Sequence, residues 1–142
     1  MTRKQLEAYR SMQEEISELK YKLQHLGEGD SMINNSTIMD YRSGYPIPQA
    51  VVGVDWDKLG KLRERYISRI AQLQKECDGV EAYIEGIEDS ITRRIFRMRF
   101  IDGLSLKQIG RTVHLDKSNI SRKIENFLKS QRTQQMQHYN NT

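Results

Sequence analysis

Apolar residues recur every three or four positions through two long stretches of this chain, and that period indicates amphipathic helices. In the first stretch the spacing averages about 3.5 residues, which is typical of a coiled-coil seam. Thr2 can cap this helix with Gln5 as its reciprocal partner, and Gly27 can end it. The apolar positions are Leu6, Tyr9, Met12, Ile16, Leu19, Leu23 and Leu26. We therefore predict one continuous helix over residues 3–26.

A second long helix with the same apolar rhythm is predicted further along the chain. We expect it to start near Asp55 or Asp57, either of which can cap it, and to continue to about Asp89. Its apolar positions are Leu59, Leu62, Tyr66, Ile70, Leu73, Cys77, Val80, Ile84 and Ile87. Because Cys77 lies on this stripe, we interpret it as a packed residue rather than a reactive thiol.

Residues 27–55 separate the two helices, and they contain both prolines and four of the nine glycines, so we predict a long disordered loop. The helices can fold back on each other as an antiparallel hairpin, or each can pair with a copy of itself. Because a two-helix hairpin has little core, we favour a homo-oligomer, most simply a dimer. Residues 1–89 would form this coiled-coil oligomerisation region through Leu19, Leu23, Leu73, Val80 and Ile84.

The segment that follows is predicted to fold as compact helices joined by tight turns. Ser90 can cap the first helix, Ile91–Ile101, and Gly103 lies where a helix ends in the left-handed conformation. A capping box formed by Ser105 and Gln108 opens the next helix. The apolar positions that we expect to point inward are Ile91, Ile95, Met98, either Phe100 or Ile101, Leu106, Ile109, Val113, Leu115, Ile120, Ile124, Phe127 and Leu128.

The last two helices of this segment fit a helix-turn-helix pattern. The earlier one spans Leu106–Val113 and is followed by the turn His114–Asp116. The later one runs from Lys117 to about Lys129, capped by Asp116 or Ser118. The predicted fold class is therefore all-α, with long coiled-coil helices followed by a three-helix helix-turn-helix domain over residues 90–129. The Gln- and Asn-rich tail, residues 130–142, is predicted to be disordered.

Charge is divided unevenly along the chain. Residues 1–89 carry 12 Lys and Arg against 16 Asp and Glu, whereas residues 90–142 carry 11 against 3. This asymmetry indicates that the C-terminal part faces a polyanion, and double-stranded DNA is the partner that we expect. The alternative is a three-helix protein-interaction domain with a solvated polar face. The arginines of the first short helix can add phosphate contacts or simply solvate an exposed face; they are Arg93, Arg94, Arg97 and Arg99.

The outward face of the last helix carries short polar and basic side chains where a recognition helix meets base edges in the major groove. Arginine pairs with guanine, asparagine with adenine, and serine with either. The base-reading residues that we expect are Lys117, Ser118, Asn119, Ser121 and Arg122. The residues that we expect at phosphates are Ser105, Lys107, Arg111, Lys123 and Lys129.

Other classes of function find little support in the sequence. The lone cysteine excludes a disulfide framework and a Cys-based zinc site. The three histidines lie in separate segments without metal-ligand spacing, and there is no Gly-rich phosphate loop. No apolar run approaches the ~20 residues of a membrane span. We therefore expect no enzymatic activity, no bound metal or cofactor, and no membrane partner.

Residues 94–105, followed by Ile109-Gly110 and the spacing of Ser118 and Ile120, resemble the fourth conserved region of bacterial sigma factors. Residues 1–10 resemble a group of small phage and prophage proteins that join a coiled coil to such a tail, similar to the ArpU and RinA type of late transcriptional regulators. Many such tails have Ala and Gly beside the turn. Here Gly110 and His114 stand instead, and a non-glycine residue can be left-handed only at some cost.

The resemblance implies a phage transcriptional regulator that binds a promoter or operator in the cytoplasm of a bacterial host, with host RNA polymerase as a candidate partner. No counterpart of the segments that open the duplex is present, so a complete sigma factor is not implied. Two alternatives remain. A terminase small subunit also combines a helix-turn-helix with oligomerisation, and it recognises phage DNA for packaging. An adaptor would bind polymerase without binding DNA.

Overall fold

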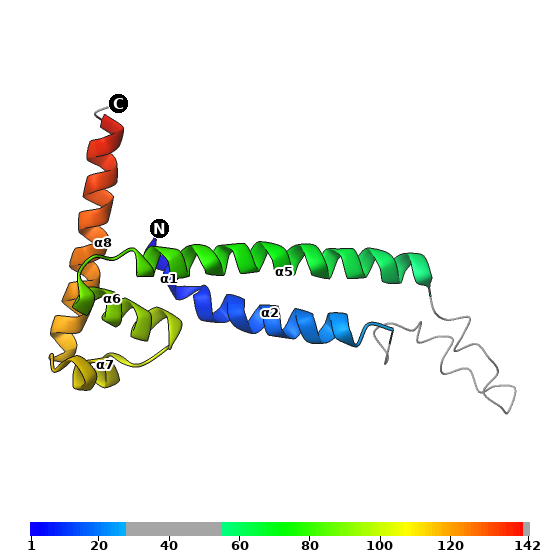
Figure 1. The fold of residues 1–142 in the computed structure, drawn as a ribbon, viewed down its shortest axis with the longest axis horizontal. Helices are drawn as coiled ribbons and strands as arrows, with labels where there is room; N and C mark the ends of the chain where they lie inside the picture. Colours follow the sequence, from blue (N-terminus) through cyan, green and yellow to red (C-terminus); the bar gives the residue numbers. More distant parts are fainter. Residues whose placement is uncertain (28–54, 141–142) are drawn as a thin grey trace, which may run out of the picture. The chain divides into compact units, whose positions relative to one another are not determined.

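The computed structural model describes residues 1–27 and 55–140, with side chains as far as residue 134. Every regular element in these ranges is helical, which confirms the predicted all-α class (Figure 1). The elements are α1 (Arg3–Glu7), α2 (Tyr9–Gln24), α5 (Trp56–Glu85), α6 (Ser90–Phe96), the π-helical turn η1 (Arg97–Ile101), α7 (Leu106–Val113) and α8 (Lys117–Asn140). The loop predicted over residues 27–55 lies, apart from its two end residues, outside the described residues.

The chain divides into two compact units. One combines Met1–Gln13 with Lys75–Thr142, and we call it the terminal unit; the other is Glu14–Gln74, which we call the central unit. The terminal unit therefore joins the first helix of the chain to the segment that the sequence assigned to a separate C-terminal domain.

In the central unit, α2 and the first part of α5 lie side by side and run antiparallel (Figure 1). A Cβ added to Gly27 would lie 4.0 Å from Leu59 Cδ2, so the end of α2 meets the start of α5. Asp55 caps α5 by accepting a 3.0 Å hydrogen bond from the Lys58 amide, which settles the choice between Asp55 and Asp57. The remaining apolar seam is only half-buried, at Leu19, Leu23, Leu62, Tyr66 and Ile70.

Part of the predicted oligomer interface is buried within the single chain. Leu73, Val80 and Ile84 are all shielded from solvent, Val80 and Ile84 almost completely. Contacts within the single chain therefore cover these three side chains, and their pairing with a second copy stays a prediction. Within the terminal unit, the C-terminal part of α5 contacts α2 through the Tyr9–Glu81 hydrogen bond and α8 through the Tyr83–Phe127 ring contact.

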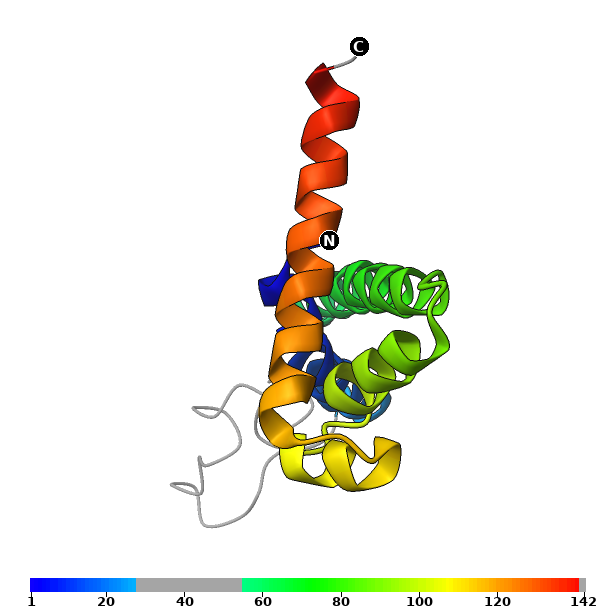
Figure 2. The same cartoon turned by 90° about the vertical axis from the view of Figure 1, so that its left-hand side faces the viewer.

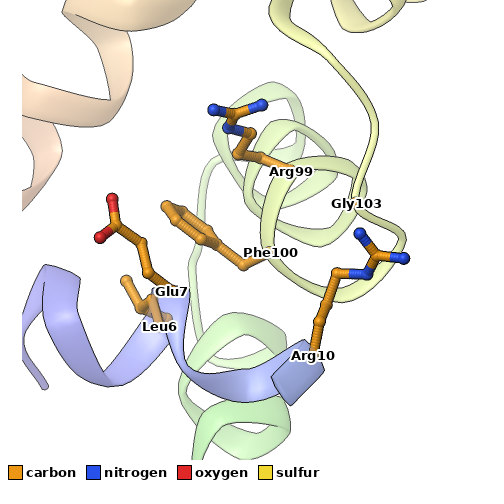
Figure 3. Close-up of a pocket in the computed structure, with 6 residues that line it drawn as sticks. All are labelled: Leu6, Glu7, Arg10, Arg99, Phe100 and Gly103. Atoms are coloured by element: carbon orange, nitrogen blue, oxygen red, sulfur yellow. The ribbon is translucent and has the colours of Figure 1, made fainter. Parts of the chain in front are cut away.

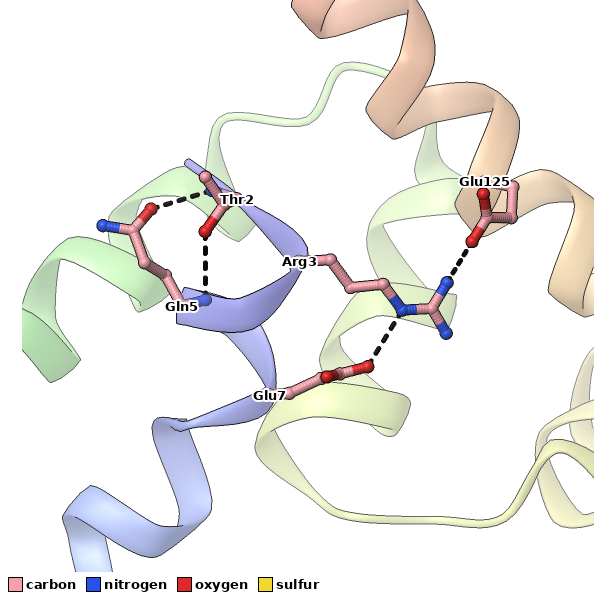
Figure 4. Close-up of polar contacts among 5 residues, drawn as sticks. All are labelled: Thr2, Arg3, Gln5, Glu7 and Glu125. Carbon is pink, nitrogen blue, oxygen red and sulfur yellow. Dashed lines mark hydrogen bonds and ion pairs between the residues drawn. The ribbon is translucent and has the colours of Figure 1, made fainter.

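The helix predicted over residues 3–26 is interrupted at Ala8 and ends at Gln24. Its predicted capping box is confirmed, because the Gln5 amide donates to Thr2 Oγ1 at 3.2 Å and the Thr2 amide donates to Gln5 Oε1 at 2.8 Å (Figure 4). No Gly or Pro marks the interruption in the sequence. The short helix α1 that results buries Leu6 completely in the terminal unit.

Tyr9, the first residue of α2, is anchored to α5 within the terminal unit. Its hydroxyl donates a 2.9 Å hydrogen bond to Glu81 Oε1 and accepts one from Gln13 Nε2. Burial, together with the Glu81 carboxylate, raises the pKa of Tyr9 to about 12. Cys77 is buried nearby, as the packing interpretation requires, and burial raises the pKa of its thiol.

The raised pKa of Tyr9 predicts a specific loss of stability in alkali. Because the folded state favours the neutral phenol, its contribution is complete below pH 10 and is lost as the pH rises toward about 12. Tyr9→Phe should therefore lose less unfolding free energy than the wild type between pH 10 and pH 12. Urea denaturation at each pH measures this difference. Parallel losses in the two proteins would contradict the prediction.

The start of α6 differs from the sequence prediction. The capping residue is Asp89 rather than Ser90: Asp89 Oδ2 accepts from the Thr92 amide at 3.0 Å and from Thr92 Oγ1 at 2.7 Å. These hydrogen bonds hold the pKa of Asp89 below its usual value. The buried face of α6 is Thr92, Ile95 and Phe96, so Ile91 lies off that face and is 43% exposed, contrary to expectation.

The core of the terminal unit lies where α6, η1, α7 and α8 contact one another. Phe127 of α8 packs edge-on against Phe96 of α6 at a centroid distance of 5.1 Å, and against Tyr83 at 6.3 Å. The aliphatic residues buried with them are Ile95, Ile109, Ile120, Ile124 and Leu128. α8 crosses this core and continues beyond it to Asn140, whereas the sequence predicted a helix end near Lys129 and a disordered tail (Figure 2). No Gly or Pro in that tail stops the helix.

Candidate nucleic-acid interface

Helix α7 precedes the turn to α8 and begins with the capping box that the sequence predicts. Ser105 Oγ accepts from the Gln108 amide at 3.2 Å, and the Ser105 amide donates to Gln108 Oε1 at 2.9 Å. Gly103 has φ +73°, as expected for a residue that ends a helix in the left-handed region. His114 is also left-handed, with φ 61° and ψ 43°. A residue other than glycine therefore occupies the left-handed position of this turn.

Gly110 is required by the close approach of the turn to α7. The Leu115 amide donates a 3.0 Å hydrogen bond to Gly110 O, and a Cβ built on Gly110 would lie only 2.5 Å from Leu115 O. The backbone of the turn therefore approaches α7 closely at Gly110. Any side chain at this position would push Leu115 away from α7.

Asp116 caps α8, which settles the choice between Asp116 and Ser118. Its Oδ2 accepts from the Ser118 amide at 3.2 Å and from the Ser118 hydroxyl at 2.5 Å. The Ser118 hydrogen bonds hold the pKa of this carboxyl below its usual value. A charged Asp116 therefore fixes the first turn of α8, where the expected base-reading residues lie.

Three of the expected base-reading residues form one exposed cluster on the first turns of α8. Arg122 Nη2 donates to Asn119 Oδ1 at 2.9 Å, and Arg122 Nε donates to Ser118 O at 3.4 Å. All three side chains face solvent, as does Lys117, whereas Ser121 is half-buried. The structure therefore brings Ser118, Asn119 and Arg122 together and leaves Ser121 on the inner flank of the helix.

The expected phosphate-contacting residues divide into two groups. Lys107 and Arg111 of α7 are exposed and, with Lys117, line an open cleft of about 330 Å³ beside the turn. Ser105 lies at the start of the same helix and is also exposed. The other two lie along α8: Lys123 is half-buried and lowers the pKa of Asp89, and Lys129 is exposed further along the helix.

Most of the arginines of α6 and η1 contact the protein itself. Arg93 Nη1 donates to Ile87 O at 2.7 Å, Arg97 pairs with Glu85 at 2.7 Å, and Arg99 Nη1 donates to Leu104 O at 3.1 Å. Arg94 is exposed. From the sequence, these four arginines were expected either to contact phosphates or to solvate an exposed face. Their hydrogen bonds and ion pair within the protein were not predicted.

The contact between α1 and α8 was missed by the sequence analysis. Arg3 forms an ion pair with Glu125 of α8 and a second, at 2.9 Å, with Glu7 of its own helix (Figure 4). Arg3 and Glu125 are 122 positions apart, and no local sequence signal links them. These charges are partly exposed, so their contribution to stability is modest, but they attach α1 to the helix that carries the exposed cluster.

Other kinds of site find no support in the part of the chain that the structure describes. No three His, Cys, Asp or Glu side chains there gather in a metal-binding arrangement. None of the helices in these ranges is both long and apolar enough to cross a membrane. Comparisons with protein-family models, curated proteins and solved structures found no match to this chain.

Proposed function

We propose that this protein is a sequence-specific DNA-binding regulator of transcription, with α7, the turn and α8 acting as a helix-turn-helix. The observation that carries the proposal is the exposed cluster of Ser118, Asn119 and Arg122 at the start of α8, directly after a tightly fixed turn. A recognition helix presents its N-terminal residues to base edges in this way.

The chemistry of the cluster suits base recognition. Arginine can donate two hydrogen bonds to guanine, and asparagine can both donate to and accept from adenine. Arg122 is already held by Asn119 and Ser118, so its guanidinium needs little ordering when it meets a base. The cations of the adjacent cleft, Lys107 and Arg111, would neutralise phosphates without reading sequence.

We further propose that the regulator acts as a dimer at a promoter or operator of a phage in its bacterial host. RNA polymerase is a candidate partner. The resemblance to phage regulators supports the phage setting and the polymerase partner. The half-buried apolar seam of the central unit, including Leu19 and Leu23, supports pairing of two copies there. Two half-sites bound by such a dimer should lie about 10 base pairs apart, or a multiple of that distance.

Lys107→Ala is expected to weaken binding to every duplex by about the same factor. The residue is exposed beside the turn, where a phosphate contact carries no sequence information. The slope of log affinity against log salt should fall by about 0.9, the value for one phosphate. Fluorescence anisotropy on a preferred site and a random duplex measures both. A loss confined to the preferred site would contradict this role.

The experiment that tests the proposed function combines the solution mass with a salt-titrated binding assay on fragments of phage DNA. A dimer or tetramer that selects a fragment upstream of a gene block, with affinity falling steeply in salt, supports a regulator. A ring of eight or more subunits that selects a site near packaging genes would indicate a terminase small subunit instead. Polymerase binding without DNA binding at low salt would indicate an adaptor.

A further inference from the structure

A pocket of about 240 Å³ lies in the terminal unit between the N-terminal segment and the loop that follows η1 (Figure 3). Apolar side chains and two arginines share its lining. The residues that line it are Leu6, Glu7, Arg10, Arg99, Phe100 and Gly103. Of these residues, only Arg99 belongs to a set for which the sequence offered a phosphate contact, and Arg10 was not considered there.

The positive charge of the two arginines in this pocket is not neutralised by a carboxylate of the pocket. Arg99 uses one N–H group on Leu104 O, which leaves further donors on its guanidinium. Arg10 is exposed and forms no hydrogen bond or ion pair with any residue in the described ranges. The carboxylate of the pocket, Glu7, is paired with Arg3. Two guanidinium groups therefore share a pocket whose acidic group is already engaged, and this arrangement favours an anionic ligand.

Gly103 lets Arg10 reach this position. A Cβ on Gly103 would overlap the Arg10 guanidinium, so Arg10 lies directly against the backbone of the loop (Figure 3). Two residues further on, Ser105 caps α7, and two Cα steps span at most about 7.6 Å. The pocket therefore adjoins the start of α7, where Ser105 and Lys107 are expected to contact phosphates.

We propose that Arg10 and Arg99 bind a phosphate group of the DNA backbone next to the one contacted at the start of α7. The inference rests on the proposed DNA-binding function and extends it to a residue of the N-terminal segment. Arginine suits this ligand because its planar fork donates two hydrogen bonds to phosphate oxygens. The site would give α1 and α2 a direct part in holding DNA.

The test uses Arg10→Gln in the full chain, because Arg10 is exposed and forms no hydrogen bond or ion pair within the described residues. The slope of log affinity against log salt should fall by about 0.9, equally on preferred and random duplexes. Arg10→Lys should restore the slope, since lysine also neutralises a phosphate. Arg65→Gln removes an exposed arginine of the central unit and should leave the slope unchanged.

The outcomes separate this inference from the proposed function. If the wild type binds DNA and Lys107→Ala reduces the slope but Arg10→Gln does not, the Arg10 site is overturned and the proposed function stands. If the wild type binds no duplex at low salt, the proposed function fails first. A third arm follows the Arg10 Nε–H signal by NMR during titration with inorganic phosphate. Movement with free phosphate but not with duplex would overturn the assignment to the DNA backbone.

Discussion

Gly110→Ala is expected to lower the free energy of unfolding by about 2–3 kcal/mol, because the added methyl group must displace backbone. The new Cβ would lie 2.5 Å from Leu115 O, an atom that the turn cannot move independently. Moving it breaks the hydrogen bond from the Leu115 amide to Gly110 O. The usual gain in helix propensity from Gly to Ala, about 1 kcal/mol, is smaller than this strain. Chemical denaturation monitored by circular dichroism measures the change.

Gly79→Ala is the matched control, because Gly79 is a helical glycine in α5 with nothing within 4 Å of an added Cβ. That variant should gain up to about 1 kcal/mol from propensity alone. The two glycine substitutions are therefore expected to change stability in opposite directions. Equal effects would show that the close contact at Gly110 relaxes without cost. Gly110→Ala should also abolish specific DNA binding at temperatures where the protein stays folded, since the turn sets how α8 is presented.

The features that were predicted correctly from the sequence are those whose cause is local. The capping box of Ser105 and Gln108 and the left-handed Gly103 each depend on residues within a few positions of one another, as does the choice of caps for α8, narrowed by the sequence to Asp116 or Ser118. The exposed cluster on α8 could be predicted for the same reason. Ser118 and Arg122 are one helical turn apart, so the helical period alone places them together.

The features that were missed depend on contacts distant in sequence. Nothing near Leu6 indicates that it belongs to the core of the terminal unit, and nothing near Arg3 indicates Glu125 as its partner. The capping residue of α6 also could not be predicted from the local sequence. Asp89 and Ser90 are both good capping residues, and the choice follows from which face of α6 packs inward. The buried face of α6 depends on contacts with α8, so it could not be predicted from the α6 sequence alone.

Arg122→Ala is expected to lower affinity for the preferred DNA site by about 5- to 150-fold, equivalent to the 1–3 kcal/mol of one good base contact. Affinity for random duplex should fall much less, because only a phosphate-type attraction is lost there. The side chain is exposed and, among the residues that the structure describes, bonds only to Ser118 and Asn119, so the free energy of unfolding should change by less than about 0.5 kcal/mol. Competition binding with preferred and random duplexes gives the two affinities.

Arg132→Ala supplies the control for charge, because Arg132 is an exposed arginine on the same helix, beyond the core of the terminal unit. It should leave the ratio of specific to random affinity unchanged. Equal losses on both duplexes for Arg122→Ala would remove Arg122 from the base-reading set. A change in that ratio requires an interaction that differs between base pairs, and Arg122 sits where such an interaction is geometrically available, at the first turns of a helix fixed by Asp116.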